Sequence, residues 1–268
     1  MSGRNRKVAL VTGASSGIGA DLAREFARGG HEVILVARRR EKLEALAREL
    51  GASARVIVAD LADTAAPARL LEEAGPIDVL VNNAGFGAGG TVANLDLTRQ
   101  MDIVQVNIAA LTALTRLALP GMIVRGGGRV LNVASVVAFM PGPGLAVYSA
   151  SKAYVLALSE ALHTELRGTG VTVTCLCPGS TESEFAAVAG MGGRGTMPFT
   201  MTSAEVARQG YAATMAGRRL VVTGGINKFI SLLVRLVPRG LVLDIAHKSI
   251  GGSLAASGEG ESVARSAS

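Results

Sequence analysis

Aromatic side chains are scarce in this 268-residue sequence, which has no tryptophan, three tyrosines and six phenylalanines. Proteins that bind nucleic acid commonly combine a basic surface with aromatic rings that stack on bases. The formal net charge of +6 supplies the first feature, but few rings are present for the second, and the basic residues are spread over predicted helices and both ends. We therefore expect no nucleic-acid partner and assign the positive charge to solvated helix faces and an anionic cofactor.

Cysteine and histidine are also rare. The two cysteines, Cys175 and Cys177, stand on the same face of one predicted strand and are poorly placed to bridge each other. The three histidines show no spacing typical of metal ligands. We predict no metal site and two buried, unbridged thiols, as is typical of a reducing cytoplasm.

A secretory signal is not evident. Residues 1–7 are polar, and the apolar run 8–11 that follows is far too short for the hydrophobic region of a signal peptide. Together with the cysteine usage, this pattern predicts a cytoplasmic protein.

Charged residues make up only 18% of the chain and hydrophobic residues 49%, which favours a folded core over disorder. Short apolar runs alternate with helical patterns, and the runs are continuous rather than alternating, as in strands buried on both faces. The predicted strands are 8–11, 33–36, 56–58, 79–81, 130–133, 171–175 and 220–222. This order predicts the α/β class: a single-domain, Rossmann-type, doubly wound parallel sheet with helices on both faces.

No internal domain boundary is evident. Residues 1–250 are predicted to form one domain, which includes an aperiodic loop at 182–202. Loops of this length in a compact domain are typically lids or binding segments. The Gly/Ser/Ala-rich residues 251–268 are predicted to be a disordered tail.

A glycine-rich turn joins the first predicted strand to a helical segment at 20–28. Such a turn lets backbone amides approach a pyrophosphate at the positive end of the helix. The spacing is Gly-x-x-x-Gly-x-Gly rather than the commoner Gly-x-Gly-x-x-Gly, but the strand before and the helix after supply the required context. The cofactor-binding residues predicted here are Gly13, Ser15, Ser16, Gly17, Ile18 and Gly19.

The end of the second predicted strand indicates which dinucleotide is bound. NAD-specific folds place an acidic residue near this point to hold the ribose hydroxyls, whereas this chain has Ala37 followed by Arg38 and Arg39. Guanidinium groups pair well with a 2′-phosphate, and a bound anion would also relieve the arginines that oppose the dipole of the helix at 41–50. We therefore predict NADP(H), with NAD(H) as the alternative.

The residues with the clearest chemistry are Ser135, Tyr148 and Lys152. Tyr148 and Lys152 are four residues apart in a predicted helix, 148–167, so both project from one face. An unperturbed phenol titrates near pH 10, and we expect the nearby ammonium to lower the pKa of Tyr148 and make it usable as an acid or base. Ser135, at the end of a predicted strand, is placed to donate a hydrogen bond to a substrate oxygen.

Taken together, these residues resemble the short-chain dehydrogenase/reductase family over residues 7 to about 225. The resemblance also includes Asp60-Leu61, Asn82-Asn83-Ala84-Gly85, Asn107 and Pro178-Gly179 with Thr181. It implies that Tyr148 exchanges the proton, Ser135 orients the carbonyl, and Lys152 binds the nicotinamide ribose and tunes Tyr148, while Asn107 holds a water linked to Lys152. The further cofactor contacts that it implies are Asp60 and Leu61 at the adenine, Asn83, Ala84 and Gly85 at the adenosine, and Pro178, Gly179 and Thr181 at the nicotinamide.

Apolar residues near these motifs indicate a hydrophobic substrate. In the loop these are Phe185, Met191, Met197 and Phe199, and after Ser135 they are Val136, Val137, Phe139 and Met140. Each residue taken singly is better explained as part of the core.

The segment 226–250 is apolar and basic and is interrupted by Pro238, which should divide it into two short helices. Its charges argue against a transmembrane span. We rank three roles for it: a cover of the pocket beside the loop at 182–202, a subunit contact, and a peripheral helix on a membrane surface.

The sequence thus predicts an NADPH-dependent carbonyl reductase, reversible as an alcohol dehydrogenase, acting on a small hydrophobic substrate. The resemblance implies a homodimer or homotetramer that pairs helices near 98–120 and 148–167. An NAD-dependent alcohol or hydroxysteroid dehydrogenase is one alternative, and a catalytically idle NADP(H)-binding regulator is another.

Overall fold

The computed structural model describes residues 6–182 and 200–246. Seven strands form one sheet in the order β3-β2-β1-β4-β5-β6-β9, and every neighbouring pair is parallel. The strands are β1 (Val8–Thr12), β2 (Glu32–Ala37), β3 (Ala54–Val58), β4 (Val79–Asn82), β5 (Gly128–Val133), β6 (Val171–Cys177) and β9 (Leu220–Val222). The predicted α/β fold is therefore confirmed, with each strand within a few residues of its predicted place.

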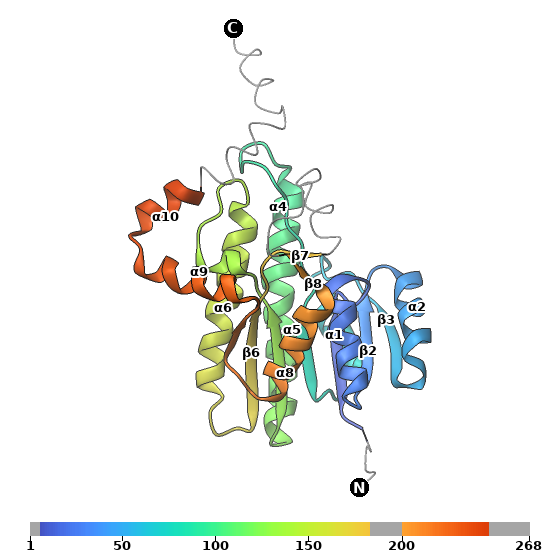
Figure 1. Cartoon of the computed structure of the whole chain (residues 1–268). Helices are drawn as coiled ribbons and strands as arrows, with labels where there is room; N and C mark the ends of the chain where they lie inside the picture. Colours follow the sequence, from blue (N-terminus) through green and yellow to red (C-terminus); the bar gives the residue numbers. More distant parts are fainter. Residues whose placement is uncertain (1–5, 183–199, 247–268) are drawn as a thin grey trace.

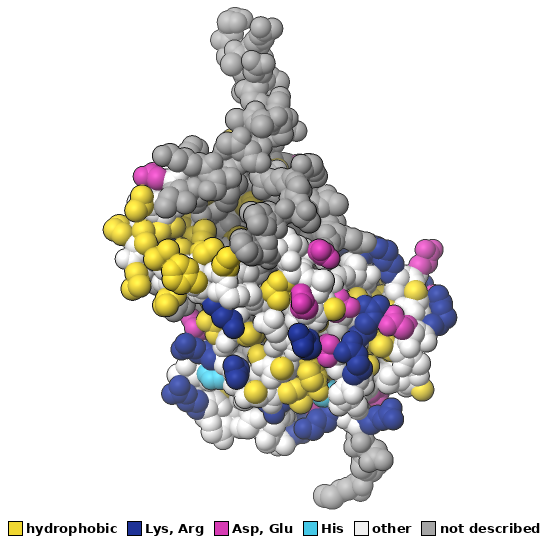
Figure 2. Space-filling model, viewed as in Figure 1, with side chains coloured by type: hydrophobic (Ala, Val, Ile, Leu, Met, Phe, Trp, Pro, Cys, Tyr) yellow, Lys and Arg dark blue, Asp and Glu magenta, His cyan; other side chains and the backbone are white. Residues whose placement is uncertain are grey.

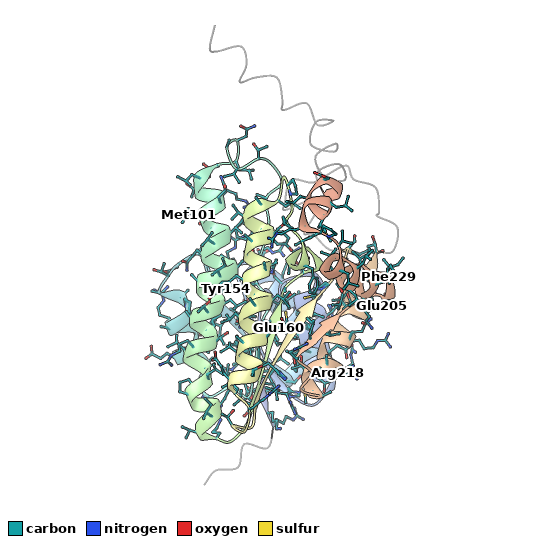
Figure 3. All side chains as sticks on the ribbon, turned by 90° about the vertical axis from the view of Figure 1, so that its left-hand side faces the viewer. Met101, Tyr154, Glu160, Glu205, Arg218 and Phe229 are labelled. Carbon is teal, nitrogen blue, oxygen red and sulfur yellow. The ribbon has the colours of Figure 1, made fainter. Side chains whose placement is uncertain are left out.

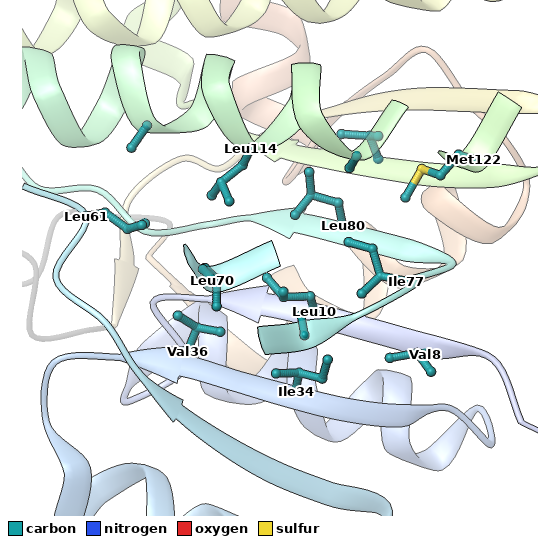
Figure 4. Packing of buried hydrophobic residues seen from close by; sticks show 14 of the residues in the cluster. Val8, Leu10, Ile34, Val36, Leu61, Leu70, Ile77, Leu80, Leu114 and Met122 are labelled. Carbon is teal, nitrogen blue, oxygen red and sulfur yellow. The ribbon is translucent and has the colours of Figure 1, made fainter. Parts of the chain in front are cut away.

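Helices cover both faces of the sheet (Figure 1). Ala9 and Val11 of β1 contact one apolar cluster, whereas Val8 and Leu10 contact the other, as the alternation of strand side chains requires. The first cluster involves α1 (Gly17–Arg28), α2 (Arg40–Leu50) and α8 (Ser203–Met215); the second, shown in Figure 4, involves α3 (Ala66–Ala74) and α5 (Leu111–Val124). Burial on both faces explains why the strands are continuously apolar.

One long helix runs from Leu97 to Val124 and comprises α4 (Leu97–Val104), the π-helical turn η2 (Gln105–Ala110) and α5. It is the one helix among the described residues that is long and apolar enough to cross a membrane by length and composition. Leu114 and Met122 of this helix are fully buried in the cluster on the sheet. This is how a core helix of the domain packs.

The order of the strands reverses beside β1, whose two neighbours are β2 and β4. In doubly wound sheets, ligands bind outside the carboxyl ends of the strands at such a reversal. The segments that follow β1, β4, β5 and β6 all emerge at this edge, as do the 3-10 helix η3 (Val136–Phe139) and the start of α6 (Ala146–Glu165).

The predicted division of the C-terminal segment at Pro238 is confirmed, because α9 (Gly225–Leu236) and α10 (Arg239–Ala246) flank that residue. The ends of the predicted loop form a small parallel pair, β7 (Thr181–Glu182) and β8 (Met201–Thr202). The loop residues Phe185, Met191, Met197 and Phe199 and the predicted tail 251–268 lie outside the described residues.

Candidate active site

The glycine turn between β1 and α1 is tightly packed. Gly13 has a φ of +67°, and a Cβ there would lie 2.7 Å from the Asn83 amide nitrogen. A Cβ on Gly19 would overlap both the carbonyl oxygen of Gly13 and the amide of Asn83. Glycine is required at both positions because backbone or neighbouring polar atoms fill the space of a side chain.

The first turn of α1 has no side-chain cap from Ser16 and no acidic residue. Its backbone N–H groups therefore remain available for an anionic ligand, as the sequence predicts for the run from Ser15 to Gly19.

Thr12 joins the ends of β1 and β4. Its hydroxyl donates to the carbonyl oxygen of Val81 at 3.1 Å and accepts from the backbone N–H groups of Asn83 and Ala84, each at 3.0 Å. The side-chain amide nitrogen of Asn83 donates a hydrogen bond to the Thr12 carbonyl oxygen at 3.0 Å. Residues 83–85 are thus held directly against the glycine turn.

The two arginines after β2 lie at this edge but have different partners. The Arg39 guanidinium donates to the hydroxyls of Ser15 at 3.0 Å and Ser16 at 2.9 Å. The exposed Arg38 lies 3.8 Å from the Asp60 carboxylate after β3. Leu61 is buried in the core. The arginines, Asp60 and the glycine turn therefore form one polar rim.

Tyr148 is buried in the first turn of α6, and its hydroxyl makes a hydrogen bond with Ser135. Burial raises the pKa of Tyr148 to about 12, and the bond with Ser135 opposes this rise only in part. The prediction that Lys152 lowers this pKa is wrong for this structure, because desolvation of the phenolate dominates. A phenol with this pKa is protonated at neutral pH and is set to donate a proton.

Lys152 is also buried, with its Nζ 5.8 Å from the centre of the Tyr148 ring. The ammonium donates to the carbonyl oxygen of Val133 at 2.9 Å. Burial lowers its pKa to about 8, although the neighbouring thiols of Cys175 and Cys177 oppose this change.

This lowered pKa predicts a pH-dependent stability. The ordinary value is 10.5, so between pH 8 and 10.5 the unfolded chain binds one more proton than the folded chain, and the free energy of unfolding rises with pH through this group. We expect the free energy of unfolding of Lys152→Met, minus that of the unsubstituted chain, to be more positive at pH 7 than at pH 10. The change in this difference should be up to about 3 kcal/mol. Urea unfolding of both proteins at both pH values measures this; a difference independent of pH would contradict it.

Asn107 lies in the π-helical turn η2 and is buried. Its amide nitrogen donates to the Phe86 carbonyl oxygen at 3.0 Å and to the Ser151 hydroxyl at 2.9 Å, and its oxygen accepts from the Phe86 N–H at 3.1 Å. A Cβ on Gly85 would lie within 3.2 Å of both Asn107 and Lys152. Asn107 is thus next to Lys152, as predicted. Ser151, which sequence reasoning missed, is a neighbour in the Tyr-x-x-x-Lys motif with no distinguishing signal of its own.

Cys175 and Cys177 are free and buried, with their sulfur atoms 3.8 Å apart. The hydrogen bond between the thiols and their burial raise the pKa of Cys177. The prediction of buried, unbridged thiols is confirmed. Among the described residues, no group of three or more His, Cys, Asp or Glu side chains is placed to hold a metal ion.

The segment after β6 is held by η3 and by α9. The Pro178 carbonyl oxygen accepts from the Val136 N–H at 2.9 Å, and the Thr181 hydroxyl donates to the Gly179 carbonyl oxygen at 3.0 Å. A Cβ on Gly179 would overlap the side chain of Asn227 in α9. Asn227 was missed because nothing in the sequence relates α9 to this turn.

Of the predicted pocket residues, Val136, Val137, Phe139 and Met140 are half-buried around η3, between Ser135 and α6. Helix α9 packs against η3.

Comparison with known proteins agrees with this geometry. The family model described as short chain dehydrogenase matches residues 7–191. The chain belongs to the short-chain dehydrogenase/reductase family. This oxidoreductase family was predicted from the motifs, and the match ends before α8, α9 and α10.

Two relatives show the extent of the sequence similarity within the family. A short chain dehydrogenase of Pseudocercospora fijiensis is 40% identical over 190 residues, or 68% of this chain and 62% of that protein. A putative ketoacyl reductase of Streptomyces coelicolor is 39% identical over 196 residues, or 70% of this chain and 75% of that protein. The match thus spans less than two thirds of the fungal relative.

Two solved structures of the same fold are also similar. A short-chain dehydrogenase from Sphingobium yanoikuyae in complex with NADPH has a TM-score of 0.77 at 33% identity, covering 89% of this chain and 96% of that one. The alcohol dehydrogenase from Comamonas testosteroni specific for bulky-bulky ketones has a TM-score of 0.75 at 31% identity, covering 87% and 92%.

Proposed function

We propose that this protein is an NADPH-dependent carbonyl reductase, reversible as an alcohol dehydrogenase, that acts on a hydrophobic substrate. The observation that carries the proposal is a buried, protonated Tyr148 hydrogen-bonded to Ser135, with Lys152 beside it, at the carboxyl edge of the sheet where the strand order reverses. A buried proton donor at this edge suits the reduction of a carbonyl.

NADP(H) fits the residues at this edge. Gly13 and Gly19 let the turn pack tightly against Asn83, and the uncapped first turn of α1 carries N–H donors that would bind the pyrophosphate. Arg38 and Arg39 would hold the 2′-phosphate, and the similar Sphingobium structure contains NADPH. Asp60, Leu61 and the run Asn83-Ala84-Gly85 would contact the adenosine, and Pro178, Gly179 and Thr181 the nicotinamide.

The reduced nicotinamide, when bound, supplies the hydride to the carbonyl carbon. Ser135 would orient the carbonyl oxygen through its hydroxyl, and Tyr148 would donate its proton to that oxygen as negative charge develops there. Lys152, held by the Val133 carbonyl oxygen, would stabilise the phenolate that remains. Asn107, bonded to Phe86 and Ser151, would keep a proton path to Lys152 in place.

Half-buried apolar residues of η3 beside Ser135 favour a hydrophobic substrate. The names of two similar proteins, a ketoacyl reductase and a dehydrogenase of bulky ketones, agree with this class. The test is a panel of aldehydes, ketones, ketoacyl thioesters and steroids, followed by the absorbance of NADPH. Firm NADPH binding without turnover on any of these carbonyls would instead favour an idle regulator.

Cofactor choice is expected to depend first on Arg38 and second on Arg39. Each arginine-to-glutamine substitution should weaken NADPH about 10- to 100-fold and NADH far less, because a hydrogen bond to a charged group contributes about 1.5–3 kcal/mol and only NADPH carries the 2′-phosphate. Calorimetric titration with both cofactors measures this. Arg40→Gln is the matched control, since Arg40 pairs with Glu44 in α2 and should leave both affinities unchanged. Equal losses for the two cofactors, or tighter NADH binding by the unsubstituted chain, would remove the NADP assignment.

We also propose one domain over residues 1–250 and a homodimer or homotetramer. The long helix Leu97–Val124 and α6 leave Leu97, Met101, Leu117 and Tyr154 exposed, which suits a subunit contact. Sedimentation velocity tests this. The cytoplasmic location stays a prediction from the sequence.

A further inference from the structure

Helix α9 exposes its apolar side. Phe229, Leu232, Leu233 and Leu236 stand at i, i+3, i+4 and i+7, which places them on one stripe. In a helix packed on a soluble domain, such a stripe faces the core. Here Phe229 is 65% exposed, Leu232 60% and Leu236 76%.

Two polar residues of α9, Asn227 and Ser231, face the body of the protein, and Val234 on the same side is half-buried. Ser231 is 9% exposed and donates to the Lys228 carbonyl oxygen, while Asn227 donates to the Thr223 carbonyl oxygen at 2.8 Å and lies against Gly179. The polarity of α9 is thus inverted relative to the body of the protein. An exposed apolar stripe of this kind marks a surface that meets an apolar partner.

Helix α10 continues this surface with the exposed Leu241 and Leu243. We call the exposed apolar residues of both helices the C-terminal patch: Ile226, Phe229, Ile230, Leu232, Leu233, Leu236, Leu241 and Leu243. In Figure 2 the apolar atoms gather at one projecting edge of the molecule, where Figure 1 places α9 and α10.

The C-terminal patch is separate from the surface proposed for subunit contact. In Figure 3, Phe229 lies on the opposite side of the molecule from Met101, with Tyr154 of α6 between them. A dimer through the long helix and α6 would therefore leave the C-terminal patch uncovered.

Charge and length indicate what the C-terminal patch meets. Residues 225–246 contain Lys228, Arg235 and Arg239 but one acidic residue, Asp244, and the chain as a whole carries a net charge of +6. An apolar stripe of Phe, Leu and Ile bordered by cations is typical of helices that lie in the interface of an anionic bilayer. With 12 and 8 residues, α9 and α10 are each too short to span the roughly 20 residues of a bilayer core.

We infer that the C-terminal patch docks this protein on the surface of an anionic lipid bilayer, with α9 and α10 lying in the interface plane. Lys228 and Arg239, both exposed, contact the headgroups, and the apolar stripe enters the acyl boundary. On the sequence alone, membrane contact ranks last among the three roles of this segment. For the exposed side of α9 we now rank it first.

The docked surface adjoins the proposed substrate site, because α9 packs against η3, which follows Ser135. Docking through the C-terminal patch would place the proposed substrate site close to apolar carbonyl compounds that are dissolved in the bilayer. This step rests on the proposed function: the substrate class becomes carbonyls that partition into lipid.

Co-sedimentation of the full chain with vesicles tests the docking. We use phosphatidylcholine vesicles with about one third phosphatidylglycerol, and phosphatidylcholine vesicles alone. We expect binding to the anionic vesicles, weaker binding to the neutral ones, and a decrease near 1 M salt, where the Debye length is about 3 Å. The triple variant Phe229→Ser/Leu232→Ser/Leu236→Ser should lower the partition coefficient at least about tenfold, and Lys228→Gln/Arg239→Gln should reduce the preference for anionic lipid.

The matched control is Val92→Ser/Ile123→Ser/Val124→Ser, which removes three exposed apolar side chains outside the C-terminal patch and outside the four residues proposed for subunit contact, and it should leave vesicle binding unchanged. Circular dichroism and NADPH titration confirm that each variant is folded. No binding by the unsubstituted chain, or equal binding by the α9 triple variant, would overturn the inference. A triple variant that forms a smaller oligomer without any change in vesicle binding would assign the C-terminal patch to a second copy of the chain instead.

The substrate arm compares a long-chain ketone dissolved in vesicles with a short water-soluble ketone. The α9 triple variant should slow the first reaction and not the second. If neither ketone is reduced by any variant, the proposed function fails, whereas vesicle binding, measured without substrate or cofactor, still decides the docking.

Discussion

Replacing Tyr148 with phenylalanine is expected to lower turnover about 100- to 10,000-fold, the usual contribution of a positioned acid or base. The substitution removes the buried hydroxyl that is hydrogen-bonded to Ser135. It does not alter the polar rim formed by the glycine turn, the two arginines and Asp60. NADPH affinity should therefore be preserved. Steady-state kinetics on the carbonyl identified by the substrate panel, together with calorimetric titration of NADPH, separate the two effects.

Tyr154→Phe is the matched control for this experiment. Tyr154 lies on the same helix, but it is exposed and its hydroxyl bonds to Thr112 at 2.9 Å, away from Ser135. Turnover of this variant should stay unchanged. If Tyr148→Phe keeps more than about a tenth of the activity, another group transfers the proton.

Replacing Gly19 with alanine is expected to weaken NADPH binding by about 5- to 150-fold. The added methyl group would overlap the Gly13 carbonyl oxygen and the Asn83 amide, so the turn that faces the pyrophosphate must move. Overpacking of this kind commonly costs about 1–3 kcal/mol, and about 1.4 kcal/mol corresponds to a factor of ten in affinity. Fluorescence or calorimetric titration with NADPH measures the loss.

Gly240→Ala is the control, because a Cβ at Gly240 meets open space. It should bind NADPH with unchanged affinity. Thermal unfolding of both variants shows whether the Gly19 substitution acts on the site or on the whole fold. Unchanged affinity in a folded Gly19→Ala protein would show that the glycine turn does not hold the cofactor.

The strand pattern predicted the sheet because local and tertiary preferences agree there. Runs such as Val33–Val36 are apolar at every position, and only a strand covered on both faces buries all of them. Helix ends were less well predicted: the helix expected at 20–28 begins at Gly17, because the glycine turn itself starts the helix.

The site was predicted as a set of residues but not as an environment. Ser135, Tyr148, Lys152 and Asn107 do meet at one edge, as the family motifs implied. The pKa shift of Tyr148 was predicted in the wrong direction. The sequence shows that a lysine is near, but it does not show that burial excludes water from the phenol. The bonds from Arg39 to Ser15 and Ser16 and from Asn107 to Ser151 depend on which turns and helices meet in the fold.

The sequence by itself determined the fold class, the family and the residues of the predicted site, because hydrophobic period, glycine spacing and the Tyr-x-x-x-Lys motif are local patterns. Only the tertiary structure decided which groups are desolvated and which side of each helix faces water. The apolar stripe of α9 can also be recognised in the sequence. The sequence alone does not decide whether the stripe faces the core or the solvent, because that depends on how the helix packs. The contact of Asn227 with Gly179 and the burial of Ser231 leave Phe229 and Leu236 on the outward side.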